Sequence, residues 1–121
     1  MYTLLVVTAL LEGATGLALV GLPSRIGTLL LGSSLDAPAV LTLARVAGAA
    51  LITLALTCWL ARHDGQSRAA RGLVAAMTIY HTGVAMVLAY ASIVLVVSGL
   101  GLWPTVLFHA AMTVWCFKTW R

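Results

Sequence analysis

Four long stretches of the sequence contain few charged residues, and this pattern constrains the fold more than any other feature. They cover residues 2–22, 38–61, 71–97 and 102–120. The hydrocarbon core of a bilayer is about 30 Å thick, and about 20 apolar residues in a helix cross it. The sequence therefore predicts an all-α fold: an integral membrane four-helix bundle in which residues 1–121 form one four-span domain.

The composition supports lipid as the solvent of this chain. Charged residues make up 8% of the sequence and hydrophobic residues 62%, whereas soluble domains carry about 25% charged residues. The first stretch has no Lys or Arg before its apolar run and carries Glu12 at its centre. We therefore expect it to be a retained helix and not a cleaved signal peptide.

The basic residues predict the orientation of the chain. Four spans place the N-terminus, the loop around residues 62–71 and the C-terminus on one side of the membrane. The basic residues on that side are Arg62, Arg68, Arg71, Lys118 and Arg121. Cytoplasmic loops are enriched in Lys and Arg, so we expect both termini in the cytoplasm. Because these charges sit at helix ends and form no separate basic domain, we expect no nucleic-acid partner.

The connections carry weaker signals. The segment IGTLLLG, residues 26–32, is apolar, and we expect it to lie on the membrane surface or to fold over the bundle. Asp36, two residues before Pro38, reads as the N-cap of the second long helix. Cys58 and Cys116 fall near predicted cytoplasmic helix ends, where we expect packing residues and not a redox pair.

One ionisable residue in each predicted span lies near the middle of the membrane. These residues are Glu12, Arg45, His81 and His109. At 1.5 Å per residue, they share a layer about 5 Å thick. Charged groups at this depth cost free energy of insertion. They usually face the interior of a bundle and mark the paths of substrates, ions or protons. The four side chains therefore predict a polar site at the midplane.

Roles follow from side-chain chemistry. Glu12, His81 and His109 are candidates for acid–base catalysis, since histidine exchanges protons near neutral pH. Arg45, together with Tyr80 and Thr8, would bind a substrate. Glu12 and Arg45, on adjacent helices, form the expected ion pair. A purely structural role for that pair, and histidines bonded to backbone carbonyls, stay open as the alternative.

Four functions fit this site. The preferred one is binding, and acid–base conversion, of a lipophilic small molecule of quinone or isoprenoid type that enters from the bilayer. A second is proton-coupled transport through Glu12, since the chain resembles the small multidrug exporters in length, span number and glutamate position. A third is b-type haem held by His81 and His109; no other metal site is expected. The fourth is an anchor subunit, in a homo-oligomer or with a membrane-complex partner.

A family resemblance rests on two segments. LEGATGLALVGLPSRIGTLLLG combines an acid, small residues, an apolar run and a proline, and LARVAGAALITLAL places an arginine three residues before a glycine. Together they resemble the DoxX-like group of small four-helix bacterial membrane proteins, over roughly the first half of the chain. The resemblance implies a multi-pass protein of the bacterial inner membrane, often linked to redox or quinone systems, and it singles out Glu12 and Arg45.

Overall fold

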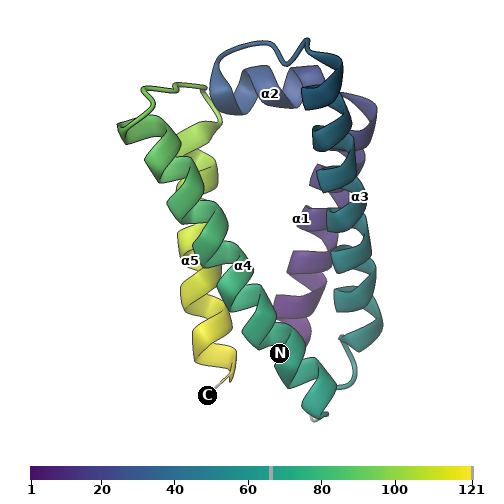
Figure 1. The fold of residues 1–121 in the computed structure, drawn as a ribbon. Coiled ribbons are helices and arrows are strands. Elements are labelled where there is room, and N and C mark those ends of the chain that lie inside the picture. Colours follow the sequence, from purple (N-terminus) through teal and green to yellow (C-terminus); the bar gives the residue numbers. More distant parts are fainter. Residues whose placement is uncertain (66, 121) are drawn as a thin grey trace. The chain divides into compact units, whose positions relative to one another are not determined.

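The computed structural model describes residues 1–65 and 67–120, and within them the chain forms five helices and no strand (Figure 1). The helices are α1 (Tyr2–Gly21), α2 (Pro23–Leu31), α3 (Pro38–Ala61), α4 (Arg68–Ile93) and α5 (Leu102–Trp120). The all-α prediction is confirmed, and the four long helices match the four predicted stretches closely. Arg121, one of the basic residues used for the orientation, lies outside the described residues.

Three of the helices, α1, α3 and α4, are long and apolar enough to cross a membrane. The structure thus agrees with a membrane protein. Among the described residues, α5 does not join this group. Its apolar run is interrupted by Pro104, His109 and Lys118.

The connection after α1 differs from the sequence expectation, because it holds a helix of its own. Pro23 ends α1 and begins the nine-residue α2. Proline suits a first helical position, where its missing N–H would lack an intrahelical partner in any case. The predicted apolar loop at residues 26–32 is therefore mostly helical.

The prediction that Asp36 caps the next helix is wrong. The N-cap of α3 is Ala37, without a side-chain hydrogen bond to the helix. The Asp36 carboxylate instead accepts hydrogen bonds from the hydroxyls of Ser24 and Ser34. Asp36 therefore stabilises the connection between α2 and α3. It lies one residue before the N-cap position of α3 and so does not cap that helix.

The first of two compact units contains residues 1–28 and 34–65, in which α1 packs antiparallel to α3. The two backbones come closest at Gly16 and Gly48. A Cβ atom added to Gly16 would lie 2.7 Å from the carbonyl oxygen of Gly48, and one added to Gly48 would lie 2.7 Å from that of Gly16. Small residues permit this approach, as they do in membrane helix pairs.

The second unit contains residues 29–33 and the described residues from Ser67 onward, in which α4 packs against α5. Ser67 caps α4 by accepting a hydrogen bond from the Ala70 N–H at 3.0 Å, so α4 begins three residues earlier than predicted. It ends at Ile93 and not at 97. Val96 has a φ of 57°, which is incompatible with a continuing right-handed helix.

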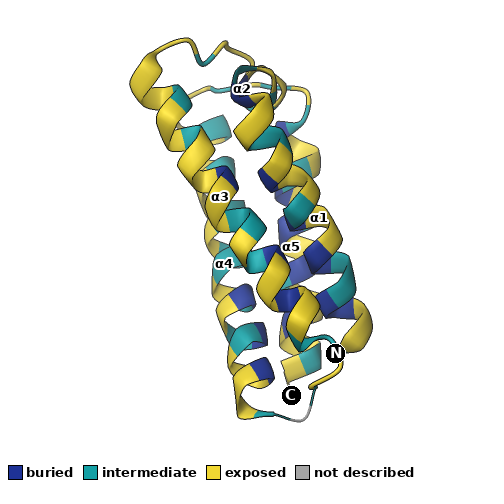
Figure 2. Cartoon of the chain, turned by 90° about the vertical axis from the view of Figure 1, so that its right-hand side faces the viewer, coloured by how far each residue is buried: buried dark blue, intermediate teal, exposed yellow. Residues whose placement is uncertain are grey.

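Exposed residues run along the long helices (Figure 2), and many of them carry large apolar side chains. Leu43 on α3 is 69% exposed and Ile79 on α4 is 76% exposed. Large contiguous patches of exposed apolar side chains are rare on soluble monomers. The hydrocarbon core of a bilayer would cover them without loss, because lipid tails are as apolar as leucine.

Candidate functional site

Two buried histidines form the centre of the candidate site in the second unit. His81 on α4 is completely buried, and His109 on α5 is nearly so. Their Nδ1 atoms lie 2.8 Å apart, at hydrogen-bond distance. Such a bond needs a proton on one nitrogen and a lone pair on the other, so the pair carries at most one positive charge. The structure thus brings together two of the predicted acid–base residues.

Aromatic rings surround this histidine pair. The ring centre of Tyr80 lies 5.1 Å from that of His81 and 5.8 Å from that of His109. Phe108 presents its ring edge-on to both histidines, at 6.3 Å and 5.3 Å. Edge-on aromatic packing at these distances is favourable. Tyr80, predicted to bind substrate, therefore lies beside the histidines as expected.

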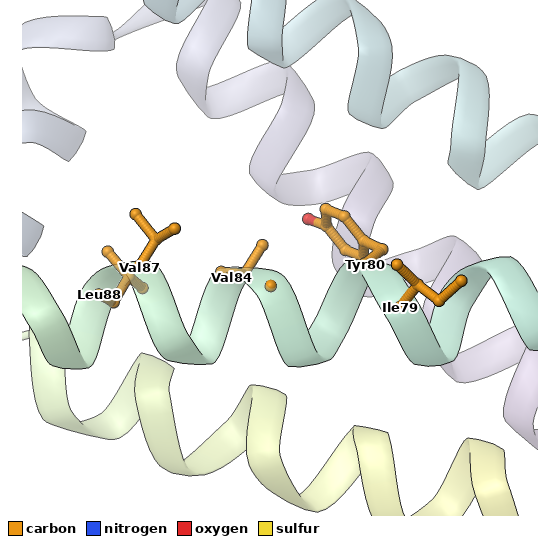
Figure 3. Close-up of a pocket in the computed structure, with 6 residues that line it drawn as sticks. Ile79, Tyr80, Val84, Val87 and Leu88 are labelled. Atoms are coloured by element: carbon orange, nitrogen blue, oxygen red, sulfur yellow. The ribbon is translucent and has the colours of Figure 1, made fainter.

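An apolar groove runs along α4 next to this cluster (Figure 3). Its volume is about 370 Å³. The residues that line it all belong to α4: Ile79, Tyr80, Gly83, Val84, Val87 and Leu88. They recur every three or four positions, which places them on one side of the helix. Tyr80 is the residue that the groove shares with the histidine cluster.

The first unit holds two other predicted site residues, Thr8 and Glu12. They lie four residues apart on α1 and are both buried, with exposed fractions of 2% and 3%. The hydroxyl of Thr8 has no hydrogen-bond partner among the described residues. Glu12 is the one acidic residue inside the long helices. A buried carboxylate of this kind in a membrane helix points to function.

Arg45 has a different partner from the one that the sequence predicts. Its Nε donates a hydrogen bond to the carbonyl oxygen of Val20 at 3.3 Å, and its side chain is exposed. Val20 is eight residues from Glu12, or about 12 Å along α1. Arg45 therefore fastens α3 to the C-terminal end of α1, away from the turn that carries the carboxylate.

We expect the substitution Arg45→Gln to lower the free energy of unfolding by less than about 1 kcal/mol, because an exposed single hydrogen bond contributes little. Breaking a buried ion pair with Glu12 would instead destabilise by about 3–5 kcal/mol. Unfolding by sodium dodecyl sulfate in mixed micelles, followed by circular dichroism, measures the difference. A loss of about 3–5 kcal/mol in the free energy of unfolding would support the predicted ion pair with Glu12 and contradict the hydrogen bond to Val20.

The contact between the histidines bears on the haem interpretation. Two nitrogens bound to the same metal ion are separated by two bonds of about 2 Å each, with the metal between them. His81 and His109 instead touch directly through a hydrogen bond. Axial ligation of a haem would require the two rings to move apart, so the geometry favours proton exchange between them.

Sequence reasoning missed the groove and the ring of Phe108. A signal for the groove was present, since Tyr80, Val84 and Val87 follow a helical spacing around Gly83. Phe108 directly precedes His109, and residues adjacent in a helix do not normally share a face, so its contact with His81 depends on the packing of α4 against α5.

Comparisons of the chain with protein-family models, with curated proteins and with solved structures give no match. The fold and the site define the chain as an all-helical protein with three candidate membrane-spanning helices and a buried histidine pair. The resemblance to the DoxX-like group stays a prediction.

Proposed function

We propose that this chain is an inner-membrane protein that binds a lipophilic small molecule, of quinone or isoprenoid type, and converts it by acid–base chemistry. The observation that carries the proposal is the buried His81–His109 hydrogen bond beside an apolar groove that shares Tyr80. Ligand sites typically combine apolar walls with a few convergent polar groups. In this arrangement the groove holds the apolar part of the ligand and the histidines exchange a proton with its polar part.

The proposal includes α5 as a fourth span and both termini in the cytoplasm. The 19 residues of α5 are enough to cross the hydrocarbon core. Lys118 in its last turn would then reach the headgroups of the inner leaflet, as long basic side chains do at helix ends. Arg62 in the loop before α4, together with Arg68 and Arg71 in the first turn of α4, supports the same orientation.

Glu12 enters the proposal through the membrane depth that the sequence predicts for it, as a further proton-exchanging group. Thr8, four residues earlier on α1, stays a proposed ligand-binding residue. Arg45 is left out of the proposed site, because its hydrogen bond to Val20 and its exposure fit a packing role. The partners are the bilayer and the lipophilic ligand.

The first experiment is an absorption spectrum of the detergent-purified protein, followed by mass spectrometry of its organic extract. We expect a defined lipophilic compound in the extract and no haem band. An intense Soret band would contradict the proposal in favour of haem. An extract without any enriched compound would shift the weight to transport through Glu12 or to an anchoring role.

Filling the groove provides a matched test. A Cβ atom at Gly83 meets nothing within 4 Å, and Gly83 lines the groove, so we expect a leucine side chain there to extend into the groove. We expect Gly83→Leu to reduce the co-purified compound about fivefold, equivalent to about 1 kcal/mol of binding free energy. Gly72→Leu, equally unobstructed on the same helix but outside the groove, is the control. Equal amounts of the compound in both variants would contradict binding in the groove.

A further inference from the structure

We infer that the polar head of the ligand is a hydroxyl group, of an alcohol or a phenol, and that it binds at Nε2 of His81. This inference rests on the proposed function and names the ligand class for the same site. His81 is completely buried, and its Nε2 has no hydrogen-bond partner among the described residues. Buried polar atoms nearly always have a partner, so this nitrogen marks the place where a bound molecule supplies one.

The hydrogen bond between the histidines links the state of Nε2 to that of Nδ1. If His81 donates from Nδ1 to His109, a neutral His81 ring has a bare lone pair at Nε2. If His109 donates, the Nε2 atom of His81 carries the proton. The same atom is thus an acceptor in one arrangement and a donor in the other.

A hydroxyl group is the simplest ligand group that satisfies both arrangements, because it can donate and accept. An ether or carbonyl oxygen only accepts, so it satisfies His81 in one arrangement and leaves the lone pair bare in the other. The shared proton of the histidine pair therefore favours a ligand with a hydroxyl group over a ligand whose oxygen can only accept a hydrogen bond.

The same geometry provides a path for the proton of the hydroxyl group. The ligand O–H bond breaks, its electron pair stays on oxygen, and the proton forms a new bond to His81 Nε2. His81 releases its Nδ1 proton to Nδ1 of His109 across the 2.8 Å contact. The ligand becomes an alkoxide or phenoxide and His109 becomes an imidazolium, so one negative and one positive charge arise together. Return of the proton reverses each step.

The groove indicates what the rest of the ligand looks like. It extends from Ile79 to Leu88, about 13 Å along the helix axis, and its lining is almost entirely apolar. Tyr80 lines it and its ring also lies beside both histidine rings, so the groove and the histidine cluster adjoin at this residue. The occupant that fits is a linear apolar tail whose hydroxyl end reaches His81.

A pair of ligands that differ only in the hydroxyl hydrogen tests this inference. The probes are para-dodecylphenol and its methyl ether, titrated into the full chain in lipid nanodiscs, with binding followed by calorimetry. We expect the phenol to bind about tenfold more tightly, which corresponds to one hydrogen bond. This comparison uses the native chain, so it does not depend on whether a variant folds.

Variants locate the effect at His81. His81→Leu should abolish the preference for the phenol over the ether, and His81→Gln should restore part of it, because an amide also donates and accepts. The control is His63→Leu, at an exposed histidine that stacks on Tyr2 outside the cluster. In the native chain labelled with ¹⁵N-histidine, phenol binding should shift the Nε2 resonance of His81.

The outcomes separate the two proposals. If phenol and ether bind equally, the hydroxyl inference is overturned and the lipophilic site stands. If neither compound binds and the purified protein yields no lipophilic compound, the proposed function itself fails. A phenol preference that survives in His81→Leu would also overturn the inference, because the hydroxyl group would then bind elsewhere.

Discussion

Replacing Gly16 with alanine is expected to lower the free energy of unfolding by about 2–3 kcal/mol, the range for overpacking a rigid interface. The added methyl carbon would lie 2.7 Å from the carbonyl oxygen of Gly48 and 3.0 Å from the backbone nitrogen of Ile52. Both obstacles are backbone atoms of α3, so no side-chain rotation relieves the clash. The α1–α3 pair must move apart, and its close contact is lost along the whole hairpin.

A graded set of glycine variants makes this prediction specific. At Gly13 the new Cβ would meet the Cβ of Ala55 at 3.4 Å, an ordinary contact, so Gly13→Ala should change stability little. Gly72→Ala meets nothing within 4 Å and should stabilise α4 by up to about 1 kcal/mol through helix propensity. Detergent-induced unfolding followed by circular dichroism ranks the three. Equal stabilities for the Gly16 and Gly13 variants would show that α1 and α3 do not touch through their backbones.

The long helices could be predicted from the sequence because solvent chemistry dictates them. In lipid every backbone polar group must be satisfied internally, so an apolar run of 20 residues is helical almost regardless of its detailed composition. The buried acid–base residues were also predictable. Glu12, His81 and His109 stand out as rare ionisable groups in apolar runs, and all three are buried.

The hydrogen-bond partners of the polar side chains were harder to predict than their depth along the helices, because the partners depend on how the helices and loops pack. Depth along a helix placed Arg45 near the layer of Glu12, yet depth carries no information on which side a flexible guanidinium turns. In the structure Arg45 turns to the carbonyl oxygen of Val20. Asp36 was misread for a related reason, since the serine hydroxyls that bind it lie up to twelve residues away in the chain. The groove on α4 likewise depends on what the neighbouring elements leave uncovered.

Removing either histidine of the buried pair should destabilise the protein, and removing both should destabilise it by less than the sum of the two single effects. His81→Leu leaves His109 without its 2.8 Å partner, and His109→Leu does the same to His81. A buried polar group deprived of its partner loses about 1–3 kcal/mol. In the double variant no imidazole is left unsatisfied, and leucine keeps the apolar volume. We therefore expect the double variant to be more stable than the sum of the two single effects predicts, by about 1.5 kcal/mol, near the upper end for hydrogen bonds between membrane helices.

A second cycle between the same two helices supplies the control. The hydroxyls of Thr82 and Thr113 lie 3.4 Å apart, and each also donates to a carbonyl oxygen of its own helix. Changing both to valine should therefore give additive effects, with a coupling below about 0.5 kcal/mol. The histidine cycle tests the site because proton sharing requires a direct contact between the rings. If the histidine effects add as the threonine effects do, the two rings do not share a proton, and the relay that the proposed chemistry needs has no path between α4 and α5.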